Sequence, residues 1–226
     1  RAAAHVQAKN YDDAVSDYRA ILKQTPDLPL IRFQLAQVYR LQGNLDEALK
    51  GFRDVMETSP DPVRPLQEMA KIYVERKQYR EAVALCDEYL AKHPGHLQVS
   101  LIKASVFLSR KDYEAAKGLI TRLIGENPES GLPLTMMATV ATAEGDYNAA
   151  LETYRKIIAL NPQNFPAYMK MAYLYRTRGE MAQAIDSYEA LLSINESYGP
   201  AANDLAYIYA DMNQNLDRAL TLALKA

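Results

Sequence analysis

The sequence has one cysteine, no tryptophan and no long uninterrupted hydrophobic run. A single cysteine, Cys86, cannot form an internal disulfide, and it excludes a metal site built from several thiolates. Charged residues interrupt the apolar stretches every few positions, so none approaches the roughly 20 apolar residues that a membrane-spanning helix needs. The first residues lack the apolar segment of a signal peptide. We therefore expect no membrane insertion by this chain.

An excess of charge of one sign is also missing, because 26 Lys and Arg residues face 28 Asp and Glu residues. A chain without a basic excess is not drawn to polyanions, so we expect no binding to nucleic acid or to anionic membranes. The nine glycines are scattered, and no glycine-rich phosphate loop, nucleophile elbow or HExxH motif occurs. The sequence therefore predicts a protein that is not an enzyme and that carries no cofactor.

What the sequence does contain is a repeat with a period of 34 residues. Five prolines keep this interval: Pro26, Pro60, Pro94, Pro128 and Pro162. Two series of alanines keep it as well: Ala2, Ala36, Ala70, Ala104, Ala138, Ala172 and Ala206, and then Ala14, Ala48, Ala82, Ala116, Ala150 and Ala184. Three series in one register do not arise by chance, so we interpret the interval as a structural repeat.

Each repeat carries two apolar stripes. With the first alanines at repeat position 8, the second alanines at 20 and the prolines at 32, full repeats begin at Pro29, Val63, Leu97, Gly131, Phe165 and Gly199. Positions 4, 7, 8 and 11 then form the apolar stripe of one helix, called helix A, and positions 17, 20, 24 and 27 that of a second, called helix B. The sequence therefore predicts one helical hairpin per repeat.

The residues at fixed positions have physical roles in such a hairpin. Gly43, Gly145 and Gly179 lie between the two helices, where glycine adopts the left-handed conformation that ends a helix. The alanines are small enough to let two helices approach closely where they cross. Proline at position 32 lacks an N–H group and stops helix B.

Small residues at positions 8 and 20, tyrosine at 11 and proline at 32 resemble the tetratricopeptide repeat. The resemblance covers essentially the whole chain. It implies an all-α fold, an α-solenoid of antiparallel helix-turn-helix repeats that form a right-handed superhelix. The departures are modest: Arg32, Ser100 and Ala202 replace the large apolar residue of position 4, and Glu196 replaces the last proline.

We expect residues 1–226 to form a single array, with a partial repeat over 1–28 and six repeats that start at 29, 63, 97, 131, 165 and 199. Arg1 falls inside a helix A and Ala226 inside a helix B. We therefore expect a fragment of a longer, bacterial-type protein, truncated at both ends. Its compartment stays open between the cytoplasm and the periplasm or cell envelope.

The residues that could carry chemistry have simpler interpretations. His93 and His96 flank a turn without a matching cysteine or carboxylate, whereas a zinc site needs three or four converging ligands. We interpret them as solvent-facing turn residues, and we expect no metal site. Cys86 stands at a helix B packing position, so we interpret it as a small buried hydrophobic residue.

Most of the sixteen tyrosines fall at the core positions 11, 17 and 24, which favours packing over base or sugar stacking. Tyr173 and Tyr207, at position 9, are the exceptions.

Positions 2, 5, 6, 9, 12 and 13 of helix A lie away from the packing stripe. The resemblance implies that they line a concave groove. In the third and fourth repeats these positions carry no charge. The predicted partner-binding residues, which extend into the fifth repeat, are Gln98, Leu101, Ser105, Leu108, Leu132, Thr135, Met136, Thr139, Thr142, Met169 and Tyr173. Basic residues flank this stretch: Arg64, Lys71, Lys170 and Arg176.

Such a groove suits a peptide or helix with an apolar middle, with Leu101, Met136 and Met169 as anchors. Chaperone-binding members of the family grip a terminal carboxylate with a set of basic and asparagine side chains, and no adjoining pair of repeats here supplies that set. The sequence thus predicts a non-catalytic scaffold or adaptor for a protein or peptide partner. Two alternatives stay open: a substrate-recruiting arm of a larger enzyme, such as a glycosyltransferase, and self-association.

Overall fold

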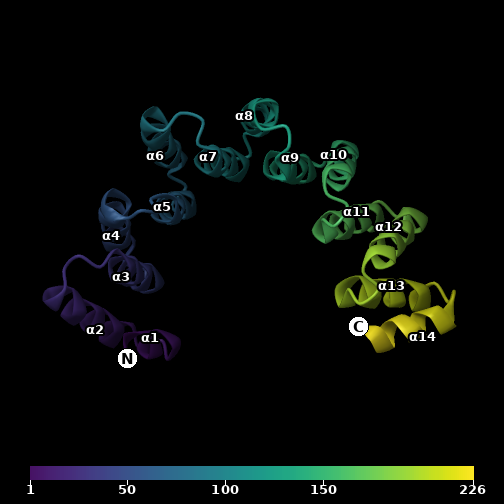
Figure 1. Cartoon of the computed structure of the whole chain (residues 1–226), viewed down its shortest axis with the longest axis horizontal. Coiled ribbons are helices and arrows are strands. Elements are labelled where there is room, and N and C mark those ends of the chain that lie inside the picture. The colour runs from purple at the N-terminus through teal and green to yellow at the C-terminus, as the bar shows by residue number, and fades with distance from the viewer. The chain divides into compact units, whose positions relative to one another are not determined.

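The computed structural model describes all of residues 1–226 and consists of helices joined by short turns, without a strand (Figure 1). The fourteen helices are α1 (Ala2–Gln7), α2 (Tyr11–Gln24), α3 (Pro29–Leu41), α4 (Leu45–Thr58), α5 (Val63–Glu75), α6 (Tyr79–Lys92), α7 (Leu97–Ser109), α8 (Tyr113–Glu126), α9 (Gly131–Glu144), α10 (Tyr147–Leu160), α11 (Phe165–Thr177), α12 (Met181–Ile194), α13 (Gly199–Asp211) and α14 (Leu216–Lys225).

The odd-numbered helices are A helices and the even-numbered helices are B helices. The A helices α3, α5, α7, α9, α11 and α13 begin at the six residues where the 34-residue spacing starts a repeat. The chain divides into two compact units, an N-terminal unit of residues Arg1–Ala116 and a C-terminal unit of residues Lys117–Ala226, with the boundary inside α8. Each unit is therefore described by itself.

The turn between helix A and helix B has a left-handed residue at repeat position 15. Glycine fills this position at Gly43, Gly145 and Gly179, with φ of 81°, 91° and 75°. The other repeats adopt the same conformation with a side chain: Lys9, Lys77, Lys111 and Asn213 all have positive φ. The turn is thus imposed by the hairpin, and glycine only makes it less costly.

Helix B ends two residues before the repeated proline, as at Gln24 before Pro26 and at Leu160 before Pro162. The helix α12 ends at the equivalent residue, Ile194, although Glu196 replaces the proline. Proline is therefore compatible with the end of helix B but is not required for it.

The repeated alanines lie where helices cross. Those at position 20 from Ala14 to Ala184 are fully buried, and those at position 8 are at most 7% exposed. Gly51 of α4 shows how close the approach is, because a Cβ atom there would lie 2.9 Å from the Cβ of Ala36 in α3. A larger side chain at these positions would push the helices apart.

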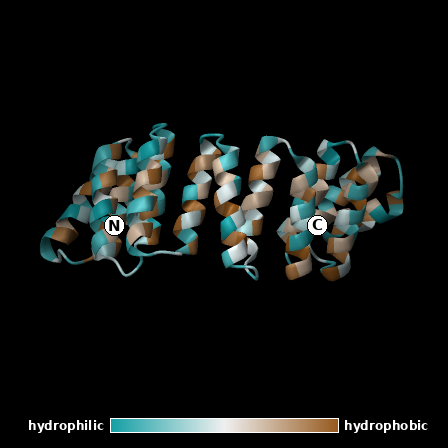
Figure 2. Cartoon of the chain, turned by 90° about the horizontal axis from the view of Figure 1, so that it is seen from above, coloured by the Kyte–Doolittle hydropathy of each residue, from teal (hydrophilic) through white to brown (hydrophobic).

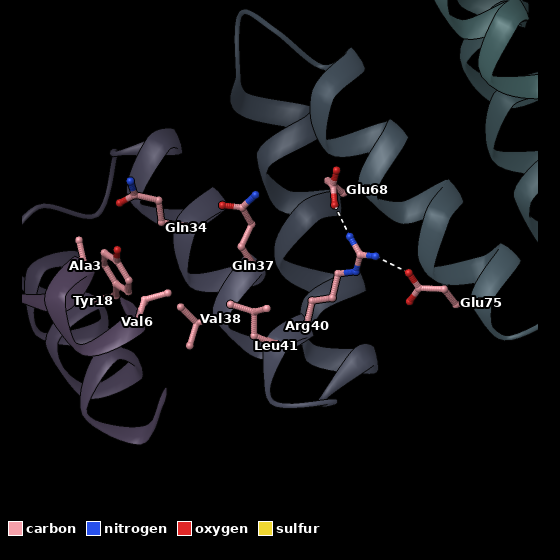
Figure 3. Close-up of a pocket in the computed structure, with 10 residues that line it drawn as sticks. All are labelled: Ala3, Val6, Tyr18, Gln34, Gln37, Val38, Arg40, Leu41, Glu68 and Glu75. Atoms are coloured by element: carbon pink, nitrogen blue, oxygen red, sulfur yellow. Dashed lines mark hydrogen bonds and ion pairs between the residues drawn. The ribbon is translucent and has the colours of Figure 1, made fainter. Parts of the chain in front are cut away.

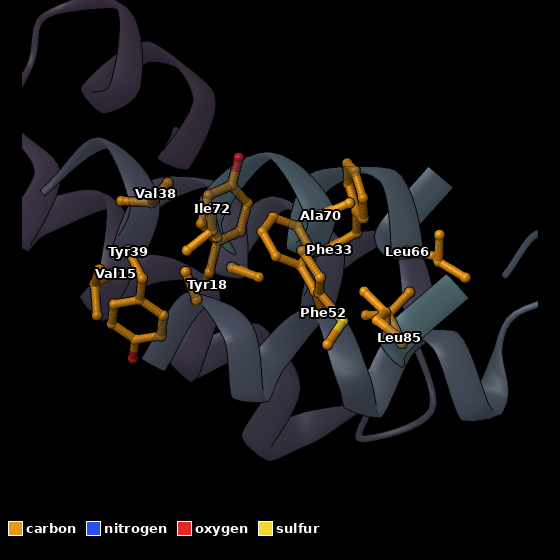
Figure 4. Packing of buried hydrophobic residues seen from close by; sticks show 14 of the residues in the cluster. Val15, Tyr18, Phe33, Val38, Tyr39, Phe52, Leu66, Ala70, Ile72 and Leu85 are labelled. Atoms are coloured by element: carbon orange, nitrogen blue, oxygen red, sulfur yellow. The ribbon is translucent and has the colours of Figure 1, made fainter. Parts of the chain in front are cut away.

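The core of the N-terminal unit forms between the A and B helices (Figure 4). Phe33 of α3 and Phe52 of α4 pack ring against ring, with centroids 5.2 Å apart. Phe52, Leu66 and Ile72 are completely buried. Each hairpin therefore buries its apolar stripes against the adjacent helices, as expected for a repeat array.

The C-terminal unit has its own buried clusters. Tyr188 of α12 packs with Leu205 of α13, and both are at most 1% exposed. Tyrosine hydroxyls join successive repeats here: Tyr175 accepts from Arg155 at 2.7 Å, and Tyr209 donates to Glu189 at 3.2 Å. Both contacts link position 11 of one repeat to position 25 of the preceding one.

Hydrophobic and hydrophilic residues share every helix, so that none is apolar throughout (Figure 2). None of the fourteen helices has the length and apolar character required to span a bilayer.

Candidate functional site

A cavity of about 710 Å³ opens on the A-helix side of the N-terminal unit (Figure 3). Its walls come from α1, α2, α3 and α5. The apolar lining consists of Ala3, Val6, Tyr18, Val38 and Leu41, and the polar lining consists of Gln34, Gln37, Arg40, Glu68 and Glu75. An apolar cavity with a few converging polar groups is the usual form of a ligand-binding site.

The charged groups at this cavity neutralise one another. The Arg40 guanidinium of α3 lies between Glu68 and Glu75 of α5 and pairs with both, at 2.5 Å from the Glu68 carboxylate (Figure 3). Lys71 pairs with the second oxygen of Glu68 at 2.7 Å. Two cations thus meet two carboxylates. The network ties α3 to α5 and presents no net charge to a ligand.

Gln34 and Gln37 supply the unused hydrogen-bonding groups of the cavity. They stand three residues apart on α3, so their side chains lie on one face of the helix. Neither amide forms a side-chain hydrogen bond within the chain. Each amide offers an acceptor oxygen and two donor hydrogens, which match the C=O and N–H groups of a peptide main chain.

A second hollow of about 210 Å³ lies between α5 and α7 of the same unit. Its lining residues are Gln67, Ala70, Lys71, Val74, Glu75, Ile102, Ser105, Val106 and Ser109. Glu75 borders both hollows. The two hollows therefore adjoin at Glu75 of α5.

The predicted residues of the N-terminal unit differ in their surroundings. Of those in α7, Ser105 lines the second hollow, Gln98 is exposed, and Leu101 and Leu108 are half-buried. Of the flanking cations, Lys71 pairs with Glu68, and the Arg64 guanidinium lies 4.5 Å from the centre of the Phe33 ring.

Phe33 itself differs from the sequence pattern. Position 5 was expected to face the groove, but Phe33 is only 4% exposed because Phe52 covers one side of its ring and Arg64 another. The sequence pattern did not predict the cavity of about 710 Å³, because the charged side chains of α3 and α5 favoured the uncharged repeats that follow as the binding surface.

In the C-terminal unit, α9 presents a row of small hydroxylated side chains. Leu132, Thr135 and Thr139 are exposed, and Met136 and Thr142 are half-buried. Each threonine hydroxyl donates to the carbonyl four residues earlier in the same helix, at 2.7–2.8 Å. Because their protons are used within the helix, these threonines present a more apolar face than their composition indicates.

The helix α11 carries the remaining predicted residues. Tyr173 is 58% exposed, Lys170 is exposed and forms no ion pair, and Met169 is half-buried. Arg176 bonds to the hydroxyl of Tyr188, which donates to Asp204 at 3.0 Å. Burial raises the pKa of Tyr188, and Arg176 works against that rise. Arg176 therefore stabilises the junction of α11, α12 and α13, and Lys170 is the unpaired cation of this helix.

Two residues considered for chemistry have structural surroundings. Cys86 is fully buried, and burial raises the pKa of its thiol to about 12. His96 does not simply face solvent, because its Nδ1 accepts from the Val99 N–H at 3.4 Å and caps α7. Its ring meets that of Tyr89 edge-on. No group of three or more His, Cys, Asp or Glu side chains converges in a way that could hold a metal ion.

The tetratricopeptide repeat family model matches the chain over residues 5–72, 40–106, 73–139 and 141–195. A comparison with curated protein sequences finds no match.

Solved structures with the same arrangement of helices include a tetratricopeptide repeat protein from Parabacteroides merdae, which is 19% identical with a TM-score of 0.60 over 98% of this chain and 87% of that chain. The C-terminal part of a repeat protein from Cytophaga hutchinsonii is 17% identical, with a TM-score of 0.60 over 99% and 93% of the two chains. PilW, a type IV pilus biogenesis factor, is 18% identical, with a TM-score of 0.58 over 87% and 91%. At this identity the likeness concerns the fold.

Proposed function

Because the chain belongs to the tetratricopeptide repeat family, we propose that it is a non-catalytic scaffold that holds a segment of a partner protein on its A helices. Repeats of this family are protein-interaction scaffolds, which supports the general role. The binding site within the chain is a proposal of its own, and we centre it on the larger cavity of the N-terminal unit.

The observation that carries this proposal is the pairing of apolar walls with unused amides in that cavity. Val6, Val38 and Leu41 would receive an apolar side chain of the partner. Gln34 and Gln37 would form hydrogen bonds with the main chain of the partner segment. These bonds would leave no buried N–H or C=O group of that segment unsatisfied. This arrangement supports recognition of an extended segment rather than of a free small ion.

The neutral ion-pair network favours a partner segment without a dominant charge. A terminal carboxylate would have to displace Glu75 or Glu68 from Arg40, and both glutamates come from the same helix, α5. A partner with an apolar residue at the cavity makes no such demand. We therefore propose that the partner segment has an apolar middle, as the sequence predicts, and that this part of it occupies the cavity.

The predicted residues further along the chain extend the proposal within each unit. In the N-terminal unit, Ser105 would contact the continuation of the bound segment in the second hollow. In the C-terminal unit, the weakly polar face formed by Leu132, Thr135, Met136, Thr139, Thr142 and Met169 would form a second contact surface. Methionines on such a face adapt to partners of different shape.

The test uses a random-peptide library displayed on phage, selected against the full chain. A selected peptide is then titrated by calorimetry into the Leu41→Glu variant and into a Gln34→Ala, Gln37→Ala double variant. We expect each to weaken binding by about tenfold or more, because a charge in the cavity or the loss of main-chain bonds costs about 1–3 kcal/mol. Leu41 is 54% exposed, so Leu41→Glu leaves the core intact.

Leu30→Glu provides the matched control, since Leu30 lies on the same helix, is 62% exposed and does not line the cavity. Its affinity should equal that of the unmodified chain. If Leu41→Glu and the double variant bind the selected peptides as tightly as Leu30→Glu does, the cavity is not the binding site.

A further inference from the structure

Four charged side chains form a connected network beside the larger cavity of the N-terminal unit: Arg40, Glu68, Lys71 and Glu75. They stand at repeat positions 12, 6, 9 and 13, which all lie away from the packing stripe of helix A. The helices α3 and α5 each pack against α4, so the arrangement of the helices does not depend on an ion pair between α3 and α5. Packing therefore does not account for the network.

Arg40 is the group of this network that would attract a ligand. A guanidinium has five N–H donors and a positive charge, and a free one binds carboxylates through paired hydrogen bonds. Here Nη1 donates to Glu68 and Nη2 donates to Glu75, so both terminal nitrogens already meet a carboxylate (Figure 3). The other N–H groups of Arg40, that of Nε included, form no hydrogen bond within the chain. Arg40 is therefore neutralised but can still donate to a neutral acceptor.

The two glutamates are not easily displaced from Arg40. The Glu68 side chain is only 14% exposed, and its second oxygen pairs with Lys71 at 2.7 Å. Separating Glu68 from Arg40 would leave a largely buried carboxylate without its guanidinium, which is unfavourable. An incoming carboxylate would also approach the negative charge of both glutamates. A ligand carboxylate therefore gains little from Arg40 and is repelled by the glutamates that hold it.

We propose that Glu68 and Glu75 determine the specificity of this cavity, an inference that rests on the proposed function. By occupying Arg40 they admit an internal, uncharged stretch of a partner chain and reject a free C-terminus or an acidic side chain. A main-chain carbonyl brings no charge and accepts from one of the unused N–H groups of Arg40. Lys71 balances the second glutamate, so a basic side chain of the partner meets no excess of negative charge either.

The experiment uses a peptide selected on the full chain, as in the test of the proposed function, and shortens it from its C-terminus one residue at a time. Each shortened peptide is made with a free carboxylate and with an amide end, and both forms are titrated by calorimetry. Where the shortened peptide ends at the cavity, the amide form should bind the unmodified chain about tenfold more tightly. Peptides that end beyond the cavity should bind equally in both forms, which provides an internal control.

The Glu68→Gln, Glu75→Gln double variant should reverse this preference, because Arg40 is then free to pair with the terminal carboxylate. The free-acid form should bind about tenfold more tightly than the amide form, and added salt should reduce this advantage. The Glu57→Gln, Glu81→Gln double variant is the matched control. Both of its glutamates are exposed in the same unit and form no ion pair, so it should behave as the unmodified chain does.

The inference is overturned if the free-acid and amide forms bind the unmodified chain equally throughout the series. It is also overturned if the Glu68→Gln, Glu75→Gln variant keeps the preference of the unmodified chain; a lowered thermal midpoint in that variant would then show that the network only stabilises the fold. In both cases the proposed function stands, provided that Leu41→Glu weakens binding. If no peptide is selected, or if Leu41→Glu binds as tightly as the unmodified chain, the proposed function fails and this inference fails with it.

Discussion

The Cys86 thiol illustrates how burial controls a single side chain. Burial raises its pKa from 9.0 to about 12, Asp87 adds to the rise, and Lys103 opposes it. Because the thiolate is the reactive form, we predict that Cys86 in the folded chain does not react with dithiobisnitrobenzoate at pH 8. In guanidinium chloride the same thiol should react at once, and spectrophotometry distinguishes the two cases.

The raised pKa also fixes the direction of a pH effect. Below pH 9 the thiol is neutral in both states, so its contribution to stability is fully present. As the pH rises from 9 through about 12, the unfolded thiol ionises first and that contribution is lost. The Cys86→Ala variant, which keeps every tyrosine, should show a shallower alkaline fall in denaturant midpoint. Equal slopes in both proteins would contradict the pKa shift.

At the level of single residues, the sequence was informative where the repeat pattern is strict. The burial of Cys86 and of the position 8 and position 20 alanines follows from register alone. It failed where a side chain has two options. His96 can face solvent or cap a helix, and Phe33 can line a groove or turn inward onto Phe52. Those choices depend on three-dimensional neighbours that no periodicity encodes.

The turn between helix A and helix B contains strained backbone in some of the repeats. Lys77 and Lys111 hold left-handed backbone, with φ of 59° and 61°, and their side chains form no ion pair. We predict that Lys77→Gly and Lys111→Gly each stabilise the chain by about 0.5–1 kcal/mol, because the relief of strain exceeds the entropy that glycine adds to the unfolded chain. Denaturant unfolding followed by circular dichroism measures this.

The same substitution inside a helix provides the control. Lys50 is exposed in the interior of α4, and Lys50→Gly should destabilise by about 1 kcal/mol. Gly145→Ala, which adds a side chain at φ 91°, should also destabilise. A loss of stability in Lys77→Gly comparable to that in Lys50→Gly would show that the turn is not strained.

For whole elements, the helix starts could be read from the spacing, but the reason for each boundary could not. Glycine marks the turn in three repeats, whereas lysine or asparagine takes the same conformation in the others. Proline marks the end of most B helices, yet α12 ends at Ile194 without it. Packing within the hairpin sets these boundaries. Glycine in the turn and proline after helix B lower the free energy needed to form them.

Across the whole molecule, a repeat pattern predicts contacts between adjacent helices far better than it predicts a surface. Packing positions recur in every repeat, so seven occurrences reinforce one another. A surface that recognises a partner depends on the residues that differ between repeats, and the N-terminal cavity is lined by such residues, Gln34 and Gln37. The sequence therefore located the A helices correctly and left the cavity unforeseen.

Most contacts between helices join elements that are adjacent in the chain. These contacts determine which helices a destabilising core substitution affects. Phe52 is fully buried against Phe33, and Phe52→Ala should cost about 3–5 kcal/mol of local stability. In a repeat array that loss stays near its origin, because each hairpin is stabilised chiefly by its neighbours. We predict that hydrogen exchange quickens in α3, α4 and α5 while α11, α12 and α13 keep their protection.

Leu205→Ala, in α13, should give the reverse pattern, since Leu205 is also fully buried. Leu220→Ala, at a side chain that is 63% exposed, should change neither. If Phe52→Ala instead reduces protection equally in all helices, the chain unfolds as one cooperative block. A substitution in one unit would then also destabilise the surface of the other unit.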